Sequence, residues 1–311
     1  MSIDTTTFLP FNADERAAQL RAGLTPGRIA PIRPFMPEQH RAFFPLLTYL
    51  FTATPDERGW PMASVLTGPR GFITSPDPTT LRIDALPQAG DPAEPGFAAG
   101  TEIGLLGLDL ATRRRNRANS SIVSRDQGLT VRIAQSFGNC PQYIQTRSVP
   151  ATNTDGRGVV SASVDLDQLD EAARDLIESA DTFFVASRGR NELGAEGGFD
   201  MSHRGGRPGF VAVQGETIVI PDFRGNGFFN TLGNLLGDPR AGLLFIDFSN
   251  GDLLQIQGTV TIDWQPEGSE PTGAERLWRV KVERAWRTRS AFPSGSTFGE
   301  FSPSTLHTGT W

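Results

Sequence analysis

Hydrophobic residues along most of this chain follow the two-residue period of β-strands, in short runs separated by polar turns rich in glycine and proline. The clearest alternation runs from Leu254 to Trp264, where every second residue is apolar. In the first half, strands are predicted at residues 50–54, 61–67, 71–74, 80–85, 102–110 and 129–137. In the second half, strands are predicted at residues 182–187, 210–213, 217–220, 242–248, 254–264 and 280–289.

Helical spacing is confined to a few short stretches. Leu232, Leu235 and Leu236 lie on one face of a helix that Gly237-Asp238-Pro239 ends, because proline cannot continue it. Helices are predicted at residues 14–22, 38–47, 167–180 and 228–236. The pattern therefore predicts a mainly β protein with few helices.

The second half repeats the order of the first. Residues 104–110 (GLLGLDL) match 242–248 (GLLFIDF) without gaps, and 49–54 (YLFTAT) resemble 182–187 (TFFVAS). We also match the Gly-x-Pro turn of residues 206–213 with residues 59–66. Two small antiparallel barrels in tandem, produced by internal duplication, account for the repeat. The predicted divisions are an N-terminal arm (1–40), a first barrel (41–148), a linker and helix (149–181), a second barrel (182–290) and a C-terminal tail (291–311).

The two copies differ at the positions best suited to binding. The second has a polar loop at residues 221–227 that opens the helix at 228–236, whereas the first has only the Pro- and Gly-rich run 86–100. The start of a helix favours anions. The first copy instead carries four arginines in residues 113–117, which predict either a solvated hairpin or a contact to a phosphate. One ligand site per chain is expected.

Composition narrows the class of protein. The chain has 311 residues, a net charge of -6 and a pI of about 5.2, so it has no general attraction for nucleic acid or an acidic membrane. Cys140 is the only cysteine, and we expect a packed thiol rather than a redox group. The three scattered histidines predict no metal site, and the start of the chain lacks the pattern of a signal peptide. We expect a cytoplasmic protein, and no catalytic side chain is identified.

Five motifs occur in a characteristic order. They are FGNCPQYIQTR (137–147), SHRGGRPGFV (202–211), IPDFRGN (220–226), NTLGNLL (230–236) and DPRAGLLFIDF (238–248). Together they resemble the FMN-binding split barrel of the pyridoxamine 5'-phosphate oxidase-like superfamily, in its flavin-nucleotide-binding subgroup. The resemblance covers roughly residues 45 to 300 and implies FMN as cofactor.

The resemblance also implies where the cofactor is bound. Family members often have a basic pair after the asparagine of the phosphate loop, but Gly227 and Phe228 stand there in this chain. Either Arg224 or the arginines of residues 113–117, Arg115 and Arg117 among them, are expected to supply the charge. The other predicted cofactor-binding residues are Ser202, His203 and Arg204 at the turn, Arg207, Pro208 and Gly209 along the flavin, Arg224 and Asn226 at the phosphate, and Gln255 at the ring edge.

The predicted function is that of an FMN-dependent oxidoreductase acting on a small molecule. The alternative is a non-catalytic binder or carrier of flavin or haem, because one fold hosts many functions. FMN is favoured over FAD because the loop closes on one phosphate. No dinucleotide-binding fingerprint is present, so a separate flavin reductase is expected to supply electrons. Direct reduction by NAD(P)H is the alternative. We expect a pseudo-dimer within one chain, and pairing of two chains is the alternative.

Overall fold

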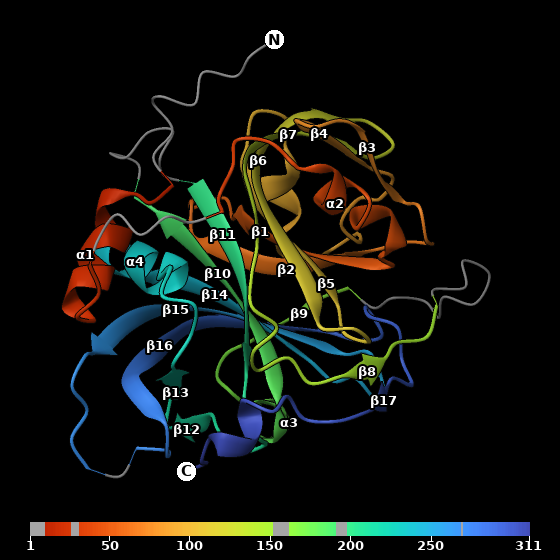
Figure 1. Cartoon of the computed structure of the whole chain (residues 1–311). Helices are drawn as coiled ribbons and strands as arrows, with labels where there is room; N and C mark the ends of the chain where they lie inside the picture. The colour runs from red at the N-terminus through yellow and green to blue at the C-terminus, as the bar shows by residue number, and fades with distance from the viewer. Residues whose placement is uncertain (1–9, 26–30, 152–161, 191–197, 269) are drawn as a thin grey trace.

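Two curved antiparallel sheets, one from each half of the chain, lie against each other (Figure 1). The computed structural model describes residues 10–25, 31–151, 162–190, 198–268 and 270–311. Short helices lie around the sheets, so the predicted mainly β fold is confirmed. No helix among the described residues is long and apolar enough to cross a membrane.

The first sheet has seven strands in the order β2-β1-β5-β6-β7-β4-β3. Its strands are β1 Tyr49–Pro55, β2 Pro61–Thr67, β3 Ile73–Asp77, β4 Thr80–Ile83, β5 Glu102–Asp109, β6 Arg114–Arg125 and β7 Leu129–Gly138. The second sheet has the order β11-β10-β14-β15-β16-β13-β12, and β9 (Val164–Leu166) pairs with β16 at its side. Its main strands are β10 Thr182–Gly189, β11 Gly198–Gly205, β12 Ala212–Gln214, β13 Thr217–Phe223, β14 Arg240–Ile246, β15 Leu253–Asp263 and β16 Ala274–Thr288.

The strand orders of the two sheets are the same, strand for strand, once β1 is equated with β10 and β2 with β11. The predicted internal repeat is therefore confirmed. The matches of 104–110 with 242–248 and of 49–54 with 182–187 fall on equivalent strands, β5 with β14 and β1 with β10.

The third match, of residues 206–213 with 59–66, is wrong. The counterpart of β2 is β11, so Gly206 corresponds to Gly68, in the turn after each strand. Both glycines are packed in the same way. A Cβ on Gly68 would lie 2.5 Å from the ring of Phe72, and one on Gly206 would lie 2.3 Å from the ring of Phe210.

The alternation of apolar residues missed the long strands β6 and β11, as well as several strands of two or three residues. In β11, the polar residues Asp200 and Ser202 are as buried as their apolar neighbours, so the burial pattern is hidden from hydropathy. The strand predicted at 210–213 is instead the turn at Phe210 followed by β12. In the first barrel, the basic run 113–117 leads directly into β6, which begins at Arg114.

The helices are short and close to their predicted positions. They are α1 Ala13–Arg21, α2 Glu38–Arg41, α3 Glu171–Ser179 and α4 Asn230–Gly237, with 3-10 turns at Phe44–Leu46, Glu94–Phe97 and Thr305–His307. The turn at Glu94–Phe97 gives some order to the run 86–100, which lies between β4 and β5 as α4 lies between β13 and β14. Of the predicted linker, residues 152–161 lie outside the described part of the chain.

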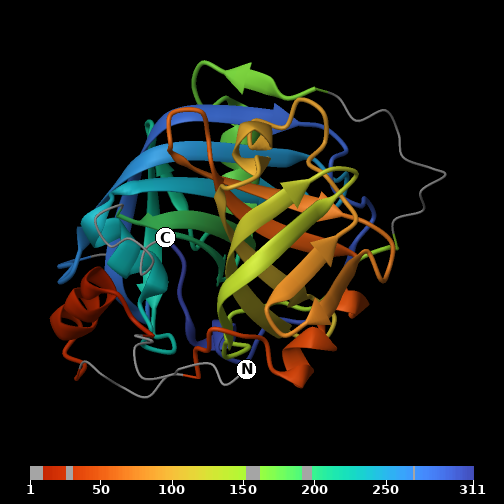
Figure 2. The same cartoon turned by 90° about the horizontal axis from the view of Figure 1, so that it is seen from above.

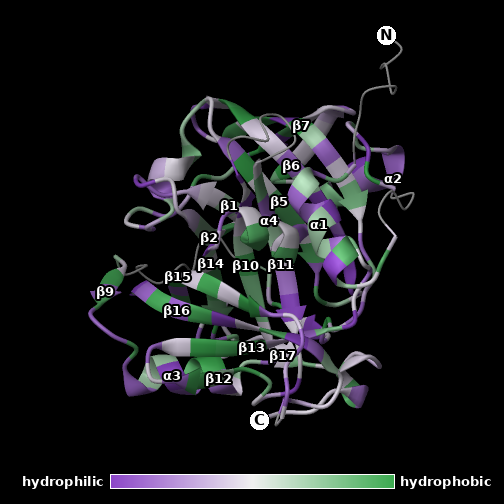
Figure 3. Ribbon diagram, turned by 90° about the vertical axis from the view of Figure 1, so that its left-hand side faces the viewer, coloured by the Kyte–Doolittle hydropathy of each residue, from purple (hydrophilic) through white to green (hydrophobic). Residues whose placement is uncertain are grey.

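Successive residues of the inner strands face different cores, as the two-residue period requires. Leu50 packs inside the first barrel and Phe183 inside the second. Their neighbours Phe51 and Phe184 enter a third cluster, between the barrels. Green and purple segments alternate along several strands in Figure 3. Each sheet thus curls around its own core and packs its other face against its counterpart.

Equivalent residues meet at this interface. Phe51 and Phe184, each the third residue of its strand, stack with ring centroids 3.7 Å apart and planes at 18°. The backbones also approach closely on both sides. A Cβ on Gly104 would lie 2.5 Å from the carbonyl oxygen of Phe199, and one on Gly242 would lie 2.5 Å from that of Pro61. Such reciprocal contacts are those of an approximate twofold axis.

The two ends of the described chain both pack on the second barrel. Helix α1 lies beside α4 (Figure 2). At the other end, β17 (Thr297–Phe298) pairs with β8 (Arg147–Ser148), and the indole Nε1 of Trp311 donates to the carbonyl oxygen of Phe210 at 3.0 Å. The tail therefore covers the second barrel.

Phe184→Ala is expected to lower the free energy of unfolding by roughly 3 to 5 kcal/mol, because it removes a fully buried ring and leaves a cavity between the barrels. Denaturant titration followed by tryptophan fluorescence measures the loss. Val123→Ala, at a residue 50% exposed on β6, is the control and should stay within about 0.5 kcal/mol of the parent. A loss below about 1 kcal/mol for Phe184→Ala would show that the stacked pair is not central to the interface.

Candidate functional site

A cavity lies between the two barrels, where β6 of the first faces β11, β13 and α4 of the second. The cavity has a volume of about 110 Å³ and opens to solvent. The loop from Gly225 to Gly227 and the segment at Gln142 and Tyr143 border it. Both barrels therefore contribute to one site.

The floor of the cavity is basic. Arg115 and Arg117 alternate on β6 and so point to the same face of the strand. Arg204 of β11 and Arg276 of β16 approach from the second barrel. These two share Asp222, to which Arg204 Nη1 donates at 2.7 Å and Arg276 Nε at 2.8 Å. One carboxylate thus partly balances two arginines.

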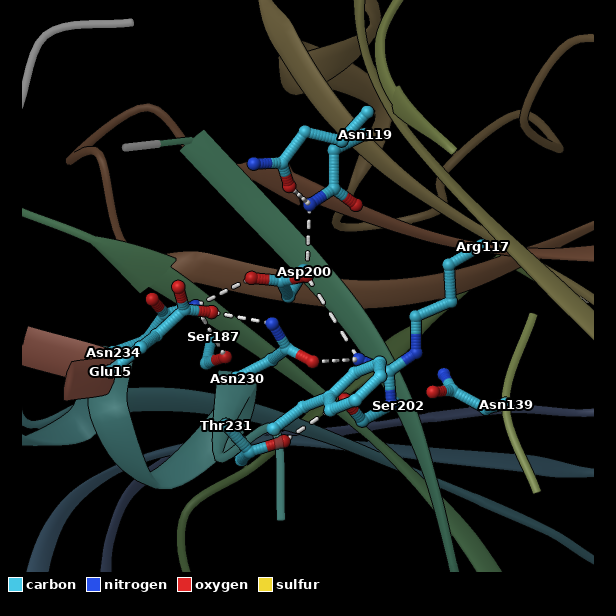
Figure 4. Close-up of polar contacts among 12 residues, drawn as sticks. Glu15, Arg117, Asn119, Asn139, Ser187, Asp200, Ser202, Asn230, Thr231 and Asn234 are labelled. Carbon is cyan, nitrogen blue, oxygen red and sulfur yellow. Dashed lines mark hydrogen bonds and ion pairs between the residues drawn. The ribbon is translucent and has the colours of Figure 1, made fainter. Parts of the chain in front are cut away.

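Arg117 and Arg115 differ in their partners. Nη1 of Arg117 lies 4.0 Å from Asp200 Oδ1 and donates to Asn230 Oδ1 at 3.4 Å (Figure 4). Arg115 makes no ion pair with any residue that the structure describes, and its Nε has no hydrogen-bond partner there. Burial, followed by repulsion from Arg117, lowers the pKa of Arg115 to about 9. Arg115 is thus a cation whose charge is not balanced within the site.

His203 is the second group without partners. It is 5% exposed, and neither ring nitrogen has a hydrogen-bond partner in the described chain. Burial, and then the cations of Arg115 and Arg204, hold the pKa of His203 well below its usual 6.5. The imidazole is therefore neutral at physiological pH, with one donor and one acceptor nitrogen.

Hydroxyl, amide and aromatic groups complete the walls. Thr231 Oγ1, at the start of α4, donates to Ser202 Oγ at 2.9 Å (Figure 4). Asn226 links the loop to the first barrel, because its Nδ2 donates to Asn139 Oδ1 at 2.7 Å. Aromatic side chains line the remaining surface at Phe210, Tyr143, Phe223 and Phe229.

Glu15, from α1, is buried beside this site, 4% exposed. Burial, and then the nearby Asp200 carboxylate, raise the pKa of Glu15 to about 8. Both effects favour the protonated form of the Glu15 carboxyl group.

The structure brings six of the predicted cofactor-binding residues together around the cavity. They are Arg115, Arg117, Ser202, His203, Arg204 and Asn226. Arg115 and Arg117 come from the basic run 113–117, for which the sequence predicted either a solvated hairpin or a contact to a phosphate.

Five other predicted residues do not line the cavity. Arg207, Pro208 and Gly209 belong to the turn after β11 and not to a strand, and Arg207 donates to the carbonyl oxygen of Leu306 at 3.1 Å. Arg224 has an exposed side chain, and its carbonyl oxygen accepts from Tyr143 Oη at 3.0 Å.

Gln255 lies on the opposite side of the twofold axis. It faces Leu244 across β14 and β15 as Arg117 faces Leu106 across β5 and β6, so it is the counterpart of Arg117. Its Nε2 donates to Asp91 Oδ1 at 3.0 Å, and Ser64, the counterpart of Ser202, donates to the same carboxylate. Gln255 and Ser64 thus lie in a groove that is equivalent to the cavity by the twofold axis. In that groove a carboxyl group of the chain itself takes the place of an external anion.

Several residues of the site were not predicted. Asp222 lies within the IPDFRGN motif, where a charged residue next to a strand end was a usable signal. Glu15 closes a capping box with Asn12, which the spacing of Asn and Glu could have indicated. Arg276 stands in a strand with many charged residues, and nothing in sequence distinguishes it.

Comparisons with known proteins give fold-level similarity only. No protein-family model and no curated protein sequence matches the chain. HupZ of Group A Streptococcus is 16% identical and matches over 41% of this chain and 100% of its own, with a TM-score of 0.31. A candidate pyridoxamine 5'-phosphate oxidase of Lactobacillus delbrueckii is 20% identical over 34% of this chain and 95% of its own, with a TM-score of 0.27. A FAD-binding protein of Mesorhizobium loti is 8% identical over 42% of this chain and 99% of its own, with a TM-score of 0.27.

Each match takes in nearly the whole of the other protein and less than half of this chain. The matches include a candidate member of the class that the sequence motifs resemble. Because every one of these TM-scores is below 0.5, the similarities carry no argument about function. The family resemblance rests on the motifs and on the repeated barrel described above.

His203 should make stability depend on pH. Below pH 6.5 the unfolded histidine takes up a proton that the folded one cannot, so the unfolding free energy should fall by up to about 1.4 kcal/mol per pH unit. His203→Gln removes this loss, and denaturant titrations from pH 7 to pH 5 should show a shallower slope for it. His307→Gln, at an exposed residue, is the control and should keep the parent slope. Equal slopes for the parent and His203→Gln would contradict a neutral, buried imidazole.

Proposed function

We propose that this cavity binds FMN and that the protein is a flavin-dependent oxidoreductase acting on a small molecule. The observation that carries the proposal is the set of buried donors without partners at Arg115, Arg117, Arg204 and His203. Uncompensated buried cations and unsatisfied donors are costly unless a ligand engages them. The motif resemblance supplies the identity of that ligand.

The residues present fit a phosphate monoester. A phosphate monoester carries close to two negative charges and several acceptor oxygens. The planar guanidinium group of arginine, with several N–H donors, binds such a group with better geometry than the ammonium group of lysine does. Arg115 supplies the unbalanced cation, and the Ser202 hydroxyl and the His203 imidazole supply further donors. The enclosed space suits the phosphate end of FMN, and the flat ring would extend toward the open side.

The departure from the family at Gly227 and Phe228 has a structural explanation that supports this assignment. Phe228 is 8% exposed and packs edge to face on Phe11 at 5.4 Å, in a small apolar cluster. A basic residue would not fit there. Arg115 and Arg117 approach the cavity from the other barrel and supply the positive charge that the loop lacks.

Bound flavin would supply hydride or single-electron transfer. The chain would bind and orient it. The Arg204–Asp222–Arg276 ion pairs hold one wall rigid, and the neutral His203 offers a donor without adding charge. The loop at Gly225–Gly227 and the start of α4 border the same cavity, and a single phosphate bound there would favour FMN over FAD. NAD(P)H or a separate reductase is the proposed electron source.

A non-catalytic carrier of flavin or haem is the second candidate. The observation that favours haem is His203, a neutral imidazole with both nitrogens free, beside arginines that could pair with propionates. Reduction of the bound cofactor by NADH or NADPH, followed by its absorbance, separates an enzyme from a carrier. A Soret band in the purified protein would favour haem.

Arg115→Gln is expected to weaken FMN binding by roughly ten- to a hundredfold, because a charge-assisted hydrogen bond to phosphate contributes about 1.5 to 3 kcal/mol. Quenching of FMN fluorescence at low salt measures the affinity. Arg224→Gln, at an exposed arginine outside the cavity, is the matched control and should bind as the parent does. If Arg224→Gln weakens binding and Arg115→Gln does not, the phosphate lies on the loop and not in this cavity.

A further inference from the structure

Helix α1 is a fixed part of the second barrel rather than a loose arm. Asp14 forms a two-pronged ion pair with Arg190, with Nε to Oδ2 at 2.8 Å and Nη2 to Oδ1 at 2.9 Å. The backbones of α1 and α4 are almost in contact. A Cβ on Gly233 would lie 2.5 Å from the Cα of Glu15, so only glycine fits there. Figure 2 shows the two helices side by side.

This docking places Glu15 in a chain of hydrogen bonds that ends at the cavity (Figure 4). Its Oε2 accepts from the backbone N–H of Asn12 at 2.8 Å, which closes the capping box of α1. Its Oε1 accepts from Asn230 Nδ2 at 2.5 Å. The other end of that amide, Asn230 Oδ1, accepts from Arg117 Nη1 at 3.4 Å. A side chain of α1 is thus connected to an arginine of the first barrel through α4.

The direction of each hydrogen bond matters. A carboxyl keeps an acceptor on both oxygens in either protonation state, whereas a glutamine at this position has only one acceptor. The glutamine would have to turn its amino group either toward the backbone N–H of Asn12 or toward the side-chain amide of Asn230. In the second case Asn230 would turn its own amino group toward Arg117, and two donors would face each other.

Apart from Asn230, Arg117 contacts the ring of Phe137, with its guanidinium carbon 5.5 Å from the ring centroid, and the carboxylate of Asp200. Asp200 lies 4.0 Å away, and both oxygens of that carboxylate already accept, from Asn119 at 2.9 Å and from Asn234 at 2.8 Å. Nε of Arg117 has no hydrogen-bond partner in the described chain. Asn230 is therefore the direct hydrogen-bonding anchor of this guanidinium.

We propose that Glu15 is a positioning residue that, through Asn230, sets where Arg117 presents its guanidinium to an anion in the cavity. The N-terminal helix is then part of the binding site although Glu15 does not line the cavity. The inference rests on the proposed function only for the identity of the anion, and inorganic phosphate tests it equally.

The first test needs no ligand. The guanidinium NMR signal of Arg117 is identified by its loss in Arg117→Gln. In the parent this signal should be sharp, as expected for a side chain held in one position. Glu15→Gln, and Glu15→Asp, whose shorter side chain cannot reach Asn230, should both shift and broaden it. Asp14→Asn removes the neighbouring carboxylate of the same helix, which pairs with Arg190 and not with Asn230. The packing of α1 on Gly233 is retained, so the signal should be unchanged. An unchanged Arg117 signal in whichever Glu15 variant folds would overturn the proposal.

The second test is a double-mutant cycle on anion affinity, measured with FMN and with inorganic phosphate. Glu15→Gln alone should weaken binding by roughly tenfold, a typical coupling between residues in one network. In the Arg117→Gln background it should have no further effect, whereas in the Arg115→Gln background its effect should remain. Equal weakening in both backgrounds would indicate a general loss of structure and overturn the inference. Binding of phosphate without FMN by the parent would refute the proposed function and leave the inference standing on its own results.

Discussion

The packing of the two barrels across an approximate twofold axis determines the rest of this structure. Phe51 and Phe184 stack on one another, and the close backbone contacts at Gly104 and Gly242 leave no room to slide one sheet along the other. Because protein interiors are close-packed, such an interface has one register. That register places β6 of the first barrel against β11 and α4 of the second, so Arg115 and Arg117 reach a cavity formed mostly by the other copy.

A twofold arrangement creates two equivalent grooves, and the chain uses them differently. In one groove, Ser64 and Gln255 donate to the carboxylate of Asp91, a residue of the loop between β4 and β5. In the other, their counterparts Ser202 and Arg117 face a cavity beside α4, with Arg115 lacking an ion-pair partner among the described residues. In the first groove the carboxyl group of Asp91 accepts from the two donors, whereas a basic cavity remains in the second. The duplicated halves thus share a fold while only one groove keeps the charge that a phosphate needs.

The sequence patterns predicted the features of the fold that depend on hydrophobicity and on local sequence, and missed those that depend on tertiary contacts. Alternating apolar residues gave the strands of the cores, and the gapless match of residues 104–110 with 242–248 gave the repeat. They missed β11, because Asp200 and Ser202 are buried by hydrogen bonding and not by hydrophobicity. Of the motif residues, Ser202, His203, Arg204 and Asn226 line the cavity, because they are near in sequence to the loop and helix that border it. Gln255 lies in the other groove, since only the pairing of strands shows on which side of the twofold axis a residue lies. Glu15 and Arg276 reach the site through tertiary contacts that no local pattern encodes.

The central claim is that one groove per chain is open and binds FMN, while Asp91 closes the other. The most direct measurement is the stoichiometry of cofactor per chain, from native mass spectrometry of the full-length protein loaded with FMN, together with chromatography of the cofactor released by heat. The account predicts one FMN per chain. Two FMN per chain would contradict the closed groove, and recovery of haem or FAD instead of FMN would contradict the assignment of the cavity.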